Sequence, residues 1–220
     1  MKELFKRYKH AGYLLYMVGY LIVFQFLEKT VTTNFHEIHI WIDDEIPFCE
    51  YFIIPYLMWF GFVAVTIVYF LFQDKKGYYK LITFLFTGMT IFLLVSYIYP
   101  NGHHLRPNVF ARDNIFVDLV KMLYEADTDT NVLPSIHVYN SIGCYIAISK
   151  CPKLRNKKWI QTGSFVLTVL IIMATMFLKQ HSVIDVVAGM VMARIIYEIV
   201  YHYEAYVDYE KKRPRLVWQK

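Results

Sequence analysis

The chain has few cysteines for its 220 residues, only Cys49, Cys144 and Cys151, and these lie on separate segments without CxxC spacing. This pattern supports neither a zinc site nor a disulfide framework. The basic start of the chain is followed by an apolar run without a small-residue cleavage site, which indicates an uncleaved first span rather than a signal peptide. The chain shows no internal repeat and no low-complexity segment, and its length predicts a single domain, residues 1–220.

Apolar and aromatic residues are abundant. They make up 57% and 18% of the chain, proportions that are typical of membrane proteins rather than of soluble domains. About six apolar runs have roughly the 17–25 residues that cross a bilayer. They lie near residues 11–27, 51–72, 81–99, 134–149, 159–178 and 182–201. We therefore expect an all-α polytopic membrane protein, built as a bundle of six transmembrane helices.

The net charge of +5 is distributed unevenly. In a six-span arrangement, the basic segments share one side, which the positive-inside rule assigns to the cytoplasm. They carry Lys2, Lys6, Arg7, Lys9, Lys75, Lys76, Lys80, Lys150, Lys153, Arg155, Lys157, Lys158, Lys211, Lys212, Arg213, Arg215 and Lys220. The opposite connections are acidic, with Glu37, Asp43, Asp44, Glu45, Asp113, Asp118, Glu125, Asp127 and Asp129. This pattern predicts cytoplasmic termini in a cell membrane, and it explains the basic excess without a nucleic-acid partner.

Two outer connections carry local patterns. In residues 28–50, Ile38, Ile40 and Ile42 alternate with other residues, which suits a strand or a segment at the membrane interface. In residues 101–133, apolar residues at helical spacing predict a short helix over residues 113–125 that lies near the membrane surface. We expect short interfacial segments on the outer side of the bundle.

His181 and Asp185 lie four residues apart at the start of the last apolar run. On a helix this spacing places both side chains on one face. A carboxylate on one ring nitrogen fixes the tautomer of a histidine and leaves the other nitrogen basic. The pair therefore suits a nucleophile or a general base, although a polar pair that only satisfies itself inside a bundle has the same spacing.

Five ionisable residues from distant stretches are predicted to meet at the outer membrane face: Arg106, His137, Lys179, His181 and Asp185. Helix N-termini there offer N–H groups to an anion, and arginine can bind phosphate oxygens in a fork. His181, oriented by Asp185, can form a phosphohistidine, while His137 can protonate the leaving oxygen. Arg106 and Lys179 supply positive charge. The set indicates phosphoryl transfer on a phosphate held at the outer membrane surface.

A metal or another cofactor is not expected. His103 and His104 are adjacent in the outer loop and offer metal ligands together with His137 or His181. Adjacent histidines rarely bind one ion together, however, and no further ligand spacing supports a site. The sequence therefore predicts chemistry that needs no metal.

These residues resemble the type 2 phosphatidic acid phosphatase (PAP2) superfamily. Its three motifs appear as Arg106-Pro107, as Pro134-Ser135-Ile136-His137, and as His181 with Asp185. The resemblance implies that His181 is the nucleophile, Asp185 its partner and His137 the acid. It also implies that Arg106 and Ser135 bind phosphate.

Several motif positions depart from the family pattern. Tyr99 replaces the lysine of the first motif, Ile136 replaces a glycine, and Ala174 and Thr175 replace a Ser-Arg pair. Lys179 is a candidate replacement for one lost cation. The variant pattern is similar to a branch related to inositol phosphorylceramide and sphingomyelin synthases.

Three functions stay open at this point. The first is a lipid phosphate phosphatase that hydrolyses a phosphomonoester or a pyrophosphate lipid. The second is a phosphotransferase that moves a phospho-headgroup to a lipid alcohol. The third is a membrane protein without enzymatic activity that binds anionic lipids.

Overall fold

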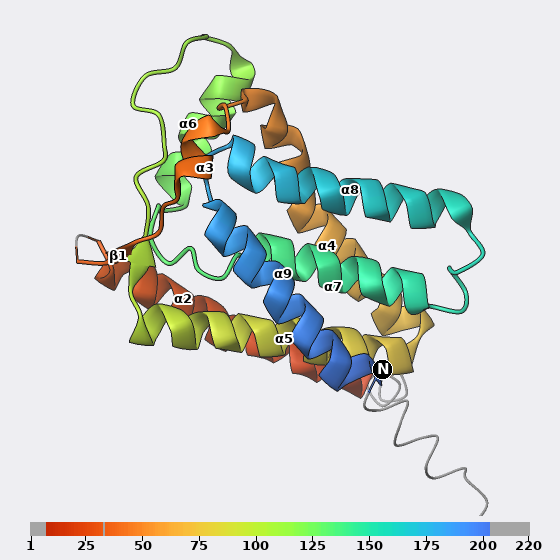
Figure 1. Ribbon diagram of the computed structural model, residues 1–220. Coiled ribbons are helices and arrows are strands. Elements are labelled where there is room, and N and C mark those ends of the chain that lie inside the picture. The colour runs from red at the N-terminus through yellow and green to blue at the C-terminus, as the bar shows by residue number, and fades with distance from the viewer. Residues whose placement is uncertain (1–7, 33, 203–220) are drawn as a thin grey trace, which may run out of the picture.

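The computed structural model describes residues 8–32 and 34–202 (Figure 1). The basic terminal segments used for the orientation, residues 2–7 and 211–220, lie outside the described residues. The described chain is mostly helical. In order it forms η1 (Lys9–Leu15), α2 (Tyr16–Thr30), β1 (His36–Glu37), α3 (Trp41–Glu45), η2 (Glu50–Phe52), α4 (Ile53–Gln73), α5 (Lys75–Ile98), β2 (Asn101–Gly102), α6 (Ile115–Ala126), α7 (Ile136–Lys150), α8 (Lys158–Phe177), α9 (Val183–Tyr197) and η3 (Glu198–His202).

Four helical segments of the described chain are long and apolar enough to cross a membrane: Lys9–Thr30, Glu50–Gln73, Lys75–Ile98 and Lys158–Phe177. The structure therefore agrees with a helical membrane protein. The two remaining expected spans correspond to α7 and α9, which have 15 residues each. The arrangement of six spans stays a prediction.

Side-chain caps set where several helices begin. Asp74 accepts a hydrogen bond from Gly77 N at 3.0 Å and starts α5 directly after α4. Asn114, Ser135 and Ser182 cap α6, α7 and α9 in the same way. Such caps satisfy backbone N–H groups that have no partner within the helix.

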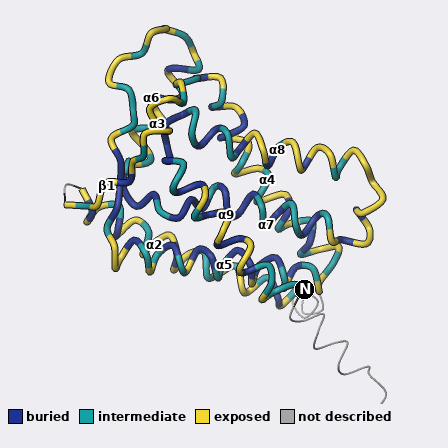
Figure 2. Tube along the Cα trace, in the orientation of Figure 1, coloured by how far each residue is buried: buried dark blue, intermediate teal, exposed yellow. Residues whose placement is uncertain are grey.

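Helix α7 lies in the centre of the bundle, between α4, α5, α8 and α9. Buried residues run along it and along the connection that precedes it (Figure 2). The ring of Tyr139 stacks on Phe84 of α5, and its hydroxyl donates to the Phe84 carbonyl oxygen at 2.6 Å. Gly88 makes this contact possible, because a Cβ there would lie 2.1 Å from the Tyr139 ring.

The two connections that we predicted to be outer, residues 28–50 and 101–133, gather at one end of the bundle, where Figure 1 shows β1, α3 and α6 together. Strands β1 and β2 pair in parallel, with His36 opposite Asn101 and Glu37 opposite Gly102. The predicted helix in the second outer connection is confirmed as α6. The α7–α8 connection, which is rich in Lys and Arg, lies at the opposite end.

The strand interpretation of residues 38–42 is wrong. The strand is confined to His36–Glu37, and the chain enters α3 at Trp41. Ile40 N donates to the Asp43 carboxylate at 2.9 Å, and Asp43 N donates to the Ile40 carbonyl at 2.9 Å. These two local bonds turn the backbone into a helix and override the alternating pattern.

Candidate active site

His181 lies on a tight turn between α8 and α9. The N–H groups of Gln180 and His181 both donate to the Thr175 carbonyl oxygen, at 2.9 and 3.0 Å. Lys179 adopts a φ of 53°, in the left-handed region that reverses a chain after a helix. The turn holds the His181 side chain inside the protein, with 8% of the residue exposed.

The two predicted histidines and the aspartate meet. His181 Nδ1 lies 3.4 Å from Asp185 Oδ2, an ion-pair contact longer than a good hydrogen bond. The His137 ring faces the His181 ring edge-on, with 5.7 Å between their centroids. The rings of Tyr56 and Trp59 lie against His137, at centroid distances of 4.6 and 4.3 Å. The two imidazoles and the carboxylate are therefore neighbours in one cluster.

Arg106 reaches this site through Gln180. Its guanidinium donates to Gln180 Oε1 at 2.7 Å, to the Thr128 carbonyl at 2.7 Å and to the Tyr124 carbonyl at 3.2 Å. It also lies over the Tyr124 ring, 4.5 Å from the centroid. These contacts fix a positive charge beside the histidine turn.

The electrostatics of the turn favour a neutral His181. Burial and the charge of Arg106 lower the pKa of His181, and a backbone hydrogen bond to Val132 raises it, with a net result of about 3. An unprotonated imidazole at neutral pH has a lone pair available for attack.

Several buried polar atoms around this site have no hydrogen-bond partner within the described part of the chain. They are Trp59 Nε1, Arg106 Nε, Gln180 Nε2, His181 Nδ1 and Asp185 Oδ1. Most buried polar groups in proteins are paired, because an unpaired one costs free energy. Three of the five atoms carry N–H groups, which suits them to bind the oxygens of an anion.

The other two predicted phosphate ligands bond to the protein itself. Lys179 Nζ donates to the Asp43 carbonyl oxygen at 2.6 Å. Ser135 is fully buried, its Oγ accepts from Val138 N at 3.4 Å, and its N–H donates to the Asp185 carbonyl at 3.1 Å. Gly189 permits this approach of α7 to α9, because a Cβ there would lie 2.8 Å from the Ser135 carbonyl oxygen.

Asp43 is a site residue that the sequence analysis missed. Its carboxylate accepts hydrogen bonds from Ser182 Oγ at 2.6 Å and from Val183 N at 2.8 Å. It therefore supplies the anion at the start of α9, where we expected free N–H groups. Asp43 belongs to an acidic run at an outer connection, and nothing in that run distinguishes it from the exposed Asp44.

His103 is a second supporting residue. Leu105 N donates to His103 Nδ1 at 3.2 Å, so Nε2 carries the proton that is donated to the Gln180 carbonyl at 2.9 Å. Burial lowers the pKa of His103, in agreement with a neutral ring. Both ring nitrogens are thus used by the protein, which does not suit a metal ligand. Within residues 8–32 and 34–202, no group of three or more His, Cys, Asp or Glu residues could hold a metal ion.

A family model described as the PAP2 superfamily matches residues 104–209. This match supports PAP2 membership. The matched segment contains Arg106, Ser135, His137, His181 and Asp185. Comparisons with curated proteins and with solved structures gave no match. PAP2 proteins are generally phosphatases or phosphotransferases, so the match suggests phosphatase-type activity on lipid phosphates.

The positions where the chain departs from the PAP2 motifs have packing roles. The Tyr99 ring stacks on His36 at 4.2 Å and thereby braces the β1–β2 pair. Ala174 is fully buried against the start of α4, and the Thr175 carbonyl holds the His181 turn. Of the cationic residues in the PAP2 motifs, Arg106 is present in this chain and also lies beside the histidine turn.

Proposed function

We propose that this chain is an integral membrane lipid phosphate phosphatase that works through a phosphohistidine at His181. The observation that carries the proposal is the meeting of His181, His137 and Asp185 beside the charge of Arg106. The superfamily match supports the same reaction class. The substrate is a phosphomonoester or pyrophosphate lipid, and the orientation predicted from charge puts the site at the outer face of a cell membrane.

In the first step, the lone pair of the unprotonated nitrogen of His181 attacks phosphorus. A P–N bond forms while the P–O bond to the lipid breaks. The electron pair of that bond goes to the leaving oxygen, which takes a proton from His137. Asp185 stabilises the positive charge that develops on the His181 ring.

In the second step, a water molecule attacks the phosphorus of the phosphohistidine. The P–N bond breaks and its electron pair returns to His181, while His137 accepts a proton from the water. The products are the dephosphorylated lipid and phosphate. Arg106 supplies a fixed positive charge for the oxygens of the transferring group in both steps.

The unpartnered N–H groups of Arg106, Gln180 and Trp59 support binding of such a group. They are already in place before a ligand binds, so they need little reorganisation to stabilise developing negative charge. Arg106 is held from three directions, which leaves its Nε–H for the substrate.

Phosphate release by the purified protein in detergent tests this proposal. The substrates are phosphatidic acid, phosphatidylglycerol phosphate and an isoprenyl pyrophosphate, each with excess chelator. We expect release by the wild type, loss in His181→Ala, and near-normal release in His104→Ala, a matched control at an exposed histidine.

The outcomes separate the three functions. Release that stops with chelator would contradict the metal-free mechanism. If no substrate releases phosphate, but a diacyl phospholipid donor passes its headgroup to a lipid alcohol in a His181-dependent reaction, the chain is a phosphotransferase. If His181→Ala leaves function intact while Arg106→Ala abolishes lipid binding, the chain is a binding protein.

A further inference from the structure

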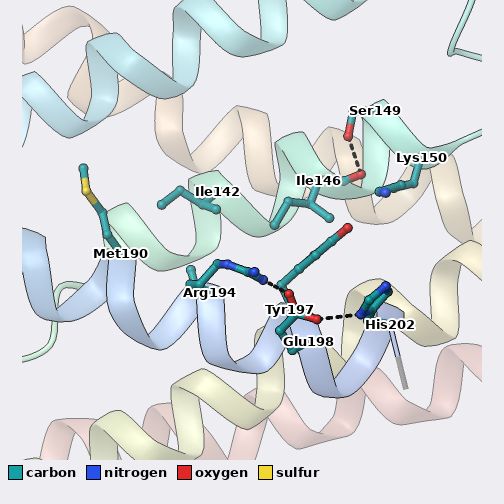
Figure 3. Close-up of a pocket in the computed structure, with 10 residues that line it drawn as sticks. Ile142, Ile146, Ser149, Lys150, Met190, Arg194, Tyr197, Glu198 and His202 are labelled. Atoms are coloured by element: carbon teal, nitrogen blue, oxygen red, sulfur yellow. Dashed lines mark hydrogen bonds and ion pairs between the residues drawn. The ribbon is translucent and has the colours of Figure 1, made fainter. Parts of the chain in front are cut away.

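A groove of about 620 Å³ lies between α7 and α9–η3, at the end of the bundle opposite to the histidine site (Figure 3). It is lined by Ile142, Ile146, Ser149, Lys150, Met190, Ala193, Arg194, Tyr197, Glu198 and His202. None of these residues takes part in the proposed hydrolysis. Its size is in the range of ligand pockets.

Both walls of the groove change from apolar to polar in the same direction. On α7, Ile142, Ile146 and Lys150 follow one another at four-residue spacing and so share one face. Across the groove, Met190 and Arg194 follow the same order along α9. Eight helical residues extend about 12 Å. Over that distance the groove changes from an apolar part, lined by Ile142, Ile146 and Met190, to a cationic rim, which we define as Lys150 and Arg194 with their neighbours Tyr197, Glu198 and His202.

The rim is positively charged. Among the described residues that line the groove, Glu198 is the only acidic one. It forms an ion pair with Arg194, and its carboxylate lies 2.9 Å from His202 Nδ1, as the dashed lines in Figure 3 show. Within the described chain, Lys150 Nζ has no carboxylate partner, and it lies 5.5 Å from the centroid of the Tyr197 ring. The side chain of Arg194 is 67% exposed, so its charge remains accessible.

We propose that this groove binds an anionic phospholipid of the surrounding membrane leaflet. One acyl chain lies along Ile142, Ile146 and Met190, and the phosphate lies at the rim beside Lys150 and Arg194. The order of apolar and cationic residues on both walls matches the order of chain and headgroup in such a lipid. The rim lies on the basic side of the bundle, where anionic lipids are attracted.

Native mass spectrometry of the purified full-length protein tests the proposal. The delipidated protein is titrated with phosphatidylglycerol and, separately, with phosphatidylcholine that has the same acyl chains. We expect the wild type to bind phosphatidylglycerol more tightly. In Lys150→Gln/Arg194→Gln that affinity should fall at least tenfold, because each cation near an anionic headgroup contributes roughly fivefold.

Arg155→Gln/Lys157→Gln is the matched control, since it removes two exposed cations from the same end of the bundle but outside the groove. It should change the affinity less than twofold. A third variant, Met190→Trp, fills the apolar part of the groove and keeps both cations, and it too should reduce binding. Unchanged elution and thermal unfolding must show that each variant is folded.

Several results would overturn the proposal. Equal weakening in the groove variant and in the control would show that the lipid responds only to net charge. Unchanged binding in Met190→Trp would show that no acyl chain occupies the groove. If Lys150→Gln/Arg194→Gln instead dissociates a dimer without loss of lipid, the groove is a contact between two copies.

Discussion

Replacing Asp43 with alanine removes the carboxylate that ties the first outer connection to the start of α9. Three donors then lose their acceptor: Ser182 Oγ, Val183 N and Ile40 N, which lie 2.6, 2.8 and 2.9 Å from the carboxylate oxygens. A hydrogen bond to a charged group contributes about 1.5–3 kcal/mol. Because water can reach two of the partly buried donors after the change, we expect the free energy of unfolding to fall by about 3–5 kcal/mol.

For a chain of this length, such a loss lowers Tm by on the order of 10 °C. The assay is thermal unfolding in detergent, with phosphate release measured on the same samples at a temperature where both proteins are folded. We also expect a lower rate, because Ser182 and Val183, which directly follow His181, both bond to the Asp43 carboxylate.

Asp44→Ala is the matched control. The Asp44 side chain is 66% exposed and, within the described residues, bonds to the exposed ring of His39, so its loss should leave Tm nearly unchanged. If Asp43→Ala and Asp44→Ala unfold within about 2 °C of each other, the buried carboxylate does not hold the turn, and the reasoning is refuted.

Three further predictions concern the proton-binding groups. Asp185→Asn should leave the fold intact and lower kcat by roughly two to four orders of magnitude, and near-normal turnover would contradict the assignment. Because burial and the charge of Arg106 lower the pKa of His181 to about 3, kcat/KM should stay level as pH falls to 5. In Arg106→Gln, the loss of kcat/KM at low pH should begin at a higher pH. A loss that begins near pH 6.5 in the wild type would contradict this prediction. Burial raises the pKa of Asp127 to about 6, so the folded state holds more protons than the unfolded one, and stability should fall as pH rises from 4 through 6. Asp127→Asn should remove that fall in Tm, and an unchanged slope would refute the cause.

Local patterns in the sequence predicted much of the fold. The spacing of Phe116, Leu119 and Leu123 indicated a helix, and α6 covers these residues. Arg194 and Glu198 lie four residues apart, a spacing that places both side chains on one helix face, and the structure contains their ion pair. Such features depend on neighbours within one or two helical turns, so a single sequence carries enough information to find them.

The supports of the histidine turn depend on distant contacts. Asp43 lies 139 residues before Ser182, from whose hydroxyl it accepts a hydrogen bond. The alternation of Ile38, Ile40 and Ile42 just before it suited a strand or an interfacial segment instead. Lys179 was predicted to face a phosphate, but its backbone φ of 53° and its bond to the Asp43 carbonyl direct it toward α3. Neither the reversal of the chain nor the buried carboxylate has a local signature, because both arise from how separate connections meet.

The long separation of Asp43 from α9 also sets an order of events while the protein is being made. At about 5–20 residues per second, the ribosome needs roughly 7–28 s to extend the chain from Asp43 to Ser182, which follows it by 139 positions. During this time the carboxylate must stay hydrated, since burying it without partners costs several kcal/mol. We therefore expect α3 to pack onto the bundle only after α9 has been made, and the end of the bundle at the histidine turn to form last.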